Sequence, residues 1–118
     1  MDILQPIKQN AGRIELVLER KTVGNDYIIT LTGGNEHVGA AAVGMYDEKS
    51  ARASASVISL PGHRDDGIAL DCARRVSAVT MTATVFIVGI HLDNITEDEI
   101  GEIIAASKQM TDKLIGSL

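Results

Sequence analysis

The stretch LPGHRDDGIAL, residues 60–70, marks the place where the chain changes from strand to helix. Before it, ARASASVISL (51–60) alternates with the period of two that is typical of a strand. A Pro-Gly pair then turns the chain. After Asp65 the apolar residues recur at a helical spacing, at Ile68, Cys72, Val76 and Val79. The stretch therefore predicts a strand, a turn and a helix over about 65–77.

The same patterns divide the rest of the chain. Strands are predicted over 12–22, 26–32 and 38–46, and the β-branched run ATVFIVGI predicts a further one over 83–90. A capping box, TEDE (96–99), predicts the start of a second helix. Four strands joined by turns form an antiparallel meander, and the crossover helix makes the fourth and fifth strands parallel. We expect a two-layer α+β sandwich of order β-β-β-β-α-β-α, with two helices on one face of a mostly antiparallel five-stranded sheet.

Composition limits the class of protein. The chain has 118 residues, of which 45% are hydrophobic, and we expect one domain over 1–118. Only 3% are aromatic and the net charge is -5, which argues against a nucleic-acid partner. One cysteine allows no internal disulfide. The longest apolar run is too short to cross a membrane and no signal peptide is recognisable, so we expect a cytoplasmic protein without membrane attachment.

All three histidines flank predicted strand ends. His63 follows the fourth strand, His91 follows the fifth, and His37 precedes the third. Parallel strands end at the same edge of a sheet, and the third strand runs antiparallel to the fourth. The three histidines are therefore predicted to share one edge with neighbouring polar and glycine residues: Gly33, Gly34, Asp65, Asp66, Asp93 and Asn94.

Several chemistries are open to such an edge. Helix N-termini, glycines and imidazoles suit a phosphate, although the carboxylates oppose an anion unless the histidines are protonated or the carboxylates turn toward backbone N–H groups. Asp65 or Asp66 instead caps the helix in the simpler interpretation, and Asp93 or Asn94 orders a turn. Without a metal-binding histidine or cysteine motif, we expect no metal site. No nucleophile motif is present either, so an enzyme using the His–Asp pairs ranks last.

Two neighbouring predicted strands are built from small residues, over 39–44 and 51–56. Close packing of helices explains small side chains on one face of these strands, but not on both. A flat second face suits a planar ligand or a second subunit, and we expect a homodimer.

Three stretches, TGGNEHVGA (32–40), LPGHRDD (60–66) and GIHLDNIT (89–96), together resemble the LpdD family of small proteins associated with UbiD-type decarboxylases. The resemblance extends from about Gly12 to the carboxyl end. It implies a chaperone or carrier for prenylated flavin mononucleotide (FMN), with a fold similar to proteasome-assembly chaperones. The candidate ligand-binding residues are Gly33, Gly34, His37, His63, Asp65, His91 and Asp93.

Two functions follow as hypotheses. In the first, the chain is a non-catalytic accessory protein that binds prenylated FMN or FMN and delivers it to a UbiD-type decarboxylase. In the second, it is a protein-assembly chaperone of the proteasome-assembly type that acts through a sheet or helix face.

Overall fold

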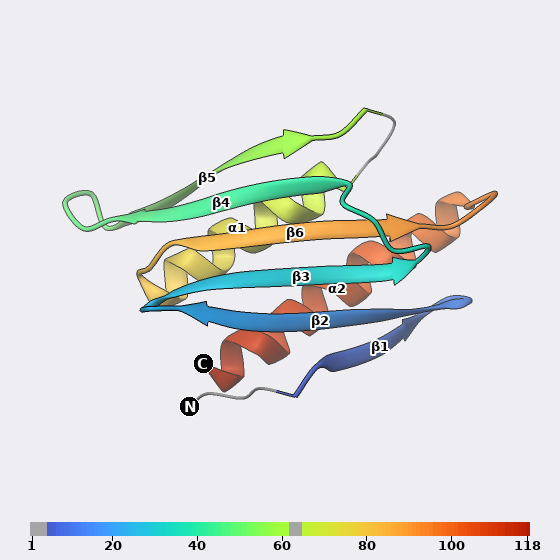
Figure 1. The fold of residues 1–118 in the computed structure, drawn as a ribbon, viewed down its shortest axis with the longest axis horizontal. Helices are drawn as coiled ribbons and strands as arrows, with labels where there is room; N and C mark the ends of the chain where they lie inside the picture. Colours follow the sequence, from blue (N-terminus) through green and yellow to red (C-terminus); the bar gives the residue numbers. More distant parts are fainter. Residues whose placement is uncertain (1–4, 62–64) are drawn as a thin grey trace.

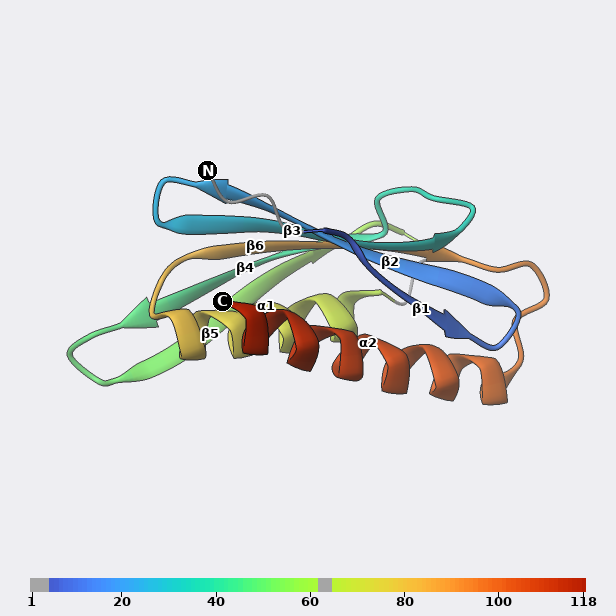
Figure 2. The ribbon, with the colours of Figure 1, turned by 90° about the horizontal axis from the view of Figure 1, so that it is seen from below.

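The structure, a computed structural model, describes residues 5–61 and 65–118. Both helices lie against one face of a single mixed sheet, so the molecule has two layers (Figures 1 and 2). The elements along the chain are β1 (Ile7–Ala11), β2 (Ile14–Val23), β3 (Asp26–Gly34), β4 (Ala40–Asp47), β5 (Arg52–Ser59), α1 (Asp66–Thr80), β6 (Thr84–His91) and α2 (Glu97–Ser117). The predicted α+β class with both helices on one face is confirmed.

The predicted sheet was wrong in two respects. Over the described residues it has six strands, because residues 7–11 form an edge strand that pairs antiparallel with β2. The strand order is β1-β2-β3-β6-β4-β5, so β6 separates β3 from β4 and interrupts the predicted meander (Figure 1). β6 is parallel to β3 and antiparallel to β4. A strand as apolar as β6 is most stable in the middle of the sheet, where neighbouring strands on both sides remove it from water.

Helix α1 accounts for the small residues on one face of β4. Ala40 and Ala42 are buried beneath the helices, together with Gly44. A Cβ atom at Gly44 would lie 2.3 Å from the carbonyl oxygen of Ala73 in α1. The helix backbone therefore approaches the sheet to a distance that only small side chains permit.

Helix α2 begins at the predicted capping box. The hydroxyl of Thr96 accepts a hydrogen bond from the Glu99 N–H (3.1 Å), and the Glu99 carboxylate accepts one from the Thr96 N–H (3.0 Å). The Arg13 guanidinium also donates to Glu99 (2.6 Å) and to the carbonyl oxygen of Asp93 (2.7 Å). The hydrogen bonds that the Glu99 carboxylate accepts from Arg13 and from the Thr96 N–H lower its pKa to about 2, the Arg13 bond being the largest cause.

The sheet face opposite the helices is apolar over β4 and β6. Register places Val43 beside Val85 and Ala41 beside Ile87, while Ala41 also pairs with Ile58 at the β5 edge. Ile58 is 75% exposed. Successive side chains of a strand point to opposite faces of the sheet, and the helix-facing residues of these strands alternate with the residues just named. The named residues therefore lie on the open face. The second small-residue face that the sequence indicated therefore carries several large aliphatic side chains.

Candidate functional site

The candidate residues that the structure describes gather at the edge where β3 and β6 end and β4 begins (Figure 1). Gly33 pairs with Ile90 and Gly34 pairs with His91 in the parallel β3–β6 register. The connection from β3 to β4 carries His37 across this edge. Helix α1 begins there as well, because the Asp65 carboxylate accepts a hydrogen bond from the Ile90 N–H (3.3 Å).

Two of the three histidines come together as predicted. The His37 and His91 rings lie edge to face with centroids 6.0 Å apart. Nε2 of His37 is 4.0 Å from the Asp65 carboxylate, and Nε2 of His91 is 3.0 Å from the Asp93 carboxylate. The third, His63, falls outside the described residues. The ligand-binding role of all these residues stays a prediction.

Asp65 has a different local role from the one expected. It occupies the N-cap position of α1, and its carbonyl oxygen accepts the Ala69 N–H (3.0 Å), but within the described ranges its side chain makes no capping hydrogen bond. Asp65 as a residue is 7% exposed, and its carboxylate turns toward β6 and His37 instead. Asp66 accepts the Gly67 N–H (2.9 Å) and so satisfies one donor of the first turn. The predicted side-chain cap is therefore not found at the N-cap residue Asp65, and Asp66 is the first residue of α1 itself.

Glycines at this edge allow backbone segments to cross closely. A Cβ atom at Gly89 would lie 1.4 Å from the carbonyl oxygen of His37, and one at Gly34 would lie 2.0 Å from that of His91. Gly34 also has a φ of 65°, which side chains disfavour. These two glycines hold the His37 connection against β6. Their contacts are to backbone, so the geometry gives Gly34 a structural role in addition to the predicted ligand approach.

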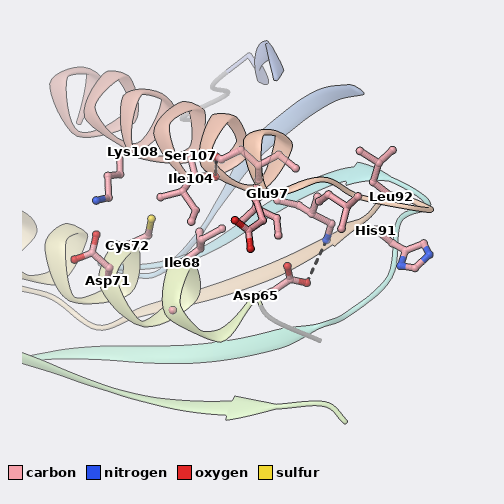
Figure 3. Close-up of a pocket in the computed structure, with 15 residues that line it drawn as sticks. Asp65, Ile68, Asp71, Cys72, His91, Leu92, Glu97, Ile104, Ser107 and Lys108 are labelled. Atoms are coloured by element: carbon pink, nitrogen blue, oxygen red, sulfur yellow. Dashed lines mark hydrogen bonds between the residues drawn. The ribbon is translucent and has the colours of Figure 1, made fainter. Parts of the chain in front are cut away.

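A pocket of about 660 Å³ lies beside this edge, between α1, α2 and the end of β6 (Figure 3). Sequence analysis did not predict it. Its apolar lining is aliphatic and comes from several elements: Ile68, Ile90, Leu92, Ile95, Ile100, Ile103 and Ile104. Ile95 is 40% exposed and Ile104 is 38% exposed. The sequence did carry a signal for this pocket: it has more isoleucines than one buried helix stripe needs.

The charged groups of the pocket are mostly acidic. Asp65, Asp71 and Glu97 contribute carboxylates, while Lys108 is the cation of its lining. Asp71 and Lys108 lie at the end of the pocket opposite His91, whose ring points away from the pocket (Figure 3). A phosphate group inside the pocket would meet more negative than positive charge.

Cys72 lines the pocket but is not an activated nucleophile. Burial raises the pKa of its thiol, and the Thr111 hydroxyl donates a hydrogen bond to its sulfur (3.3 Å). A protonated thiol is a poor nucleophile. In the part of the chain that the structure describes, His, Cys, Asp and Glu side chains form no group of three able to hold a metal ion. Over the same residues, neither helix has the length and apolar character of a membrane span.

Comparisons with known proteins show the family of the chain and support its fold. The chain belongs to the family described as the prenylated flavin chaperone LpdD-like domain, whose sequence model matches residues 10–118. No curated protein sequence matches it. Its fold is similar to a crystal structure of a chaperone complex for yeast 20S proteasome assembly, with a TM-score of 0.58 at 10% identity, covering 93% of this chain and 94% of the other. At that identity the likeness concerns the fold alone.

Proposed function

We propose that this chain is a non-catalytic carrier that binds prenylated FMN and delivers it to a UbiD-type decarboxylase. The observation that carries the proposal is the family match, which spans nearly the whole chain. The buried, protonated thiol of Cys72 supports a carrier rather than an enzyme, because it removes the cysteine as a nucleophile. We place the protein in the cytoplasm, where its single cysteine stays reduced.

The histidine pair fits the phosphate of the cofactor. Nδ1 of His37 faces the carbonyl oxygen of Asn35 (3.0 Å), and a carbonyl accepts only, so this nitrogen carries a proton. Nε2 of His91 is likewise bonded to a carboxylate that accepts, which leaves its Nδ1 to donate to a phosphate oxygen when the ring is protonated. An anion site beside aspartates was expected to require that a carboxylate turn toward a backbone N–H group. The Asp65 carboxylate meets this condition, because it accepts a hydrogen bond from the Ile90 N–H.

Binding and delivery are measured separately. The purified chain is titrated with prenylated FMN and with FMN by calorimetry, and the loaded chain is then mixed with an apo UbiD-type decarboxylase while flavin transfer is followed by size separation. We expect binding by the wild type and a strong loss in the double variant His37→Ala/His91→Ala. His63→Ala tests the third histidine of the predicted set. Absence of binding of both flavins to the wild type would refute the proposal.

We further propose that the open sheet face docks a second copy of the chain. Strands β3, β6, β4 and β5 present a plan area of about 500 Å² per copy, estimated from strand spacing and rise per residue. Stacking two such faces buries on the order of 1,000 Å² or more, which reaches the lower bound for a specific interface. Each copy carries a net charge of -5, so association depends on the apolar face rather than on charge.

Sedimentation or light scattering tests this dimer. Ile58→Lys is expected to give monomers, whereas Met81→Lys, at a position 62% exposed beyond α1, is expected to leave dimers intact. Both substitutions reduce the net negative charge equally, so general repulsion cannot explain a difference between them. Monomeric wild type, or equal behaviour of both variants, would contradict the docking of a second copy.

The open face also favours a second candidate function, assembly of another protein. In that case a UbiD-type decarboxylase binds the chain without flavin, and the complex survives His37→Ala/His91→Ala but not Ile58→Lys. Surface plasmon resonance with purified apo-decarboxylase distinguishes this behaviour from flavin-dependent delivery. The fold likeness to a proteasome-assembly chaperone complex supports this candidate at the level of fold.

A further inference from the structure

We infer that the pocket between α1 and α2 receives the ring system and the isoprenoid-derived hydrocarbon of prenylated FMN, while the phosphate stays outside at the histidine pair. The inference rests on the proposed function. It assigns a binding role to residues that the sequence did not indicate, above all the isoleucines of α2.

The size and lining of the pocket suit this part of the cofactor. A volume of about 660 Å³ lies within the range of cofactor sites. Ile68 from α1, Ile90 from β6 and Ile104 from α2 converge on the same space. Aliphatic walls favour hydrocarbon and planar rings through burial alone, without aromatic stacking. Each methylene buried strengthens binding about fourfold, so prenylated FMN is expected to bind more tightly than FMN.

The distribution of charge sets the direction of the ligand. Asp65, Asp71 and Glu97 line the pocket and disfavour a phosphate inside it. Carboxylates do accept hydrogen bonds from N–H groups, which the pyrimidine part of a flavin ring supplies. The His91 ring points out of the pocket toward the sheet edge (Figure 3), where it meets His37. His91 thus belongs to both the pocket lining and the histidine pair, and joins the two subsites.

A matched pair of substitutions tests the pocket. Ile104 in α2 lines the pocket and is 38% exposed, while Leu70 in α1 lies outside the lining and is 37% exposed. Ile104→Glu places a carboxylate in the apolar space and is expected to weaken binding roughly tenfold or more. Leu70→Glu is expected to stay within about twofold of the wild type. Ile95→Glu, in the loop before α2 and 40% exposed, is a second pocket variant.

Three probes separate the two subsites: prenylated FMN, FMN and riboflavin, each titrated by flavin fluorescence. Ile104→Glu is expected to weaken all three, whereas His91→Ala is expected to weaken only the two that carry a phosphate. Circular dichroism and thermal melting confirm that each variant folds.

The outcomes distinguish this inference from the proposed function. If the wild type binds none of the probes, the proposed function itself fails. If the wild type binds them and both folded pocket variants bind as Leu70→Glu does, the flavin lies elsewhere and the inference is wrong. If His91→Ala weakens riboflavin as much as FMN, the assignment of the phosphate to the histidine pair is wrong.

Discussion

Gly89→Ala tests how the sheet edge holds the candidate site. A Cβ atom at Gly89 would lie 1.4 Å from the His37 carbonyl oxygen, whereas ordinary contact begins at 3.4 Å. The His37 connection must therefore move by about 2 Å, which breaks the flanking hydrogen bonds from the Asn35 N–H to His91 (3.1 Å) and from the Gly39 N–H to Val88 (2.9 Å). At about 0.5–1.5 kcal/mol each, their loss lowers the free energy of unfolding by about 1–3 kcal/mol.

Thermal melting and flavin titration measure the consequence. In a domain of this size the expected loss corresponds to a fall in Tm of roughly 4–12 °C. Flavin binding falls with it, because His37 moves away from His91. Gly101→Ala in α2, outside the lining of the pocket, is the control: its Cβ would meet no atom within 4 Å, and alanine in a helix is favoured over glycine by up to about 1 kcal/mol. A Tm of Gly89→Ala within about 2 °C of the wild type would refute the reasoning.

Three further predictions concern the helices. The pKa of Glu99 falls from 4.5 in the unfolded chain to about 2 in the folded chain, so the ionised carboxylate stabilises the fold fully above pH 4.5 and this stabilisation is lost as the pH falls toward 2. The free energy of unfolding of Glu99→Gln, followed from pH 6 to pH 2, is expected to lack this pH-dependent contribution. Thr96→Ala removes the capping hydroxyl and is expected to cost about 1 kcal/mol in urea unfolding, while Thr96→Ser retains most of that energy. Because burial raises the pKa of the Cys72 thiol, Ellman's reagent is expected to label it only after unfolding, and fast labelling of the native chain would contradict its placement between the helices.

The prediction that His37 and His91 share one edge is confirmed even though the strand order was wrong, while His63 lies outside the described residues. It depended on which way each strand runs, and β5 and β6 do run in the same direction although β4 lies between them. His37 at the start of β4 and the end of β6 therefore meet at one edge in either order. The close contact between the His37 and His91 rings arises because β6 lies directly beside β4. No local pattern in the sequence indicates that these two strands are neighbours.

The pocket escaped prediction for a related reason. Its isoleucines belong to segments as far apart as Ile68 and Ile104, and periodicity reports only which face of a helix is apolar. Whether two apolar faces close on each other or leave a space depends on how α1 and α2 lie on the sheet. The open apolar face was foreseen as a flat surface, but the exposure of Ile58 is visible only once β5 is an edge strand.

The sequence by itself determined the local structure: the alternation of the strands, the helical stripe after Asp65 and the capping box at Thr96 and Glu99. These features depend on residues within a few positions of each other, so spacing is enough to predict them. Only the tertiary structure decided the place of β6, the turn of the Asp65 carboxylate toward Ile90 and the pocket between the helices. Each of these depends on burial shared by segments that are distant in the chain, and such burial is settled only when the whole core packs.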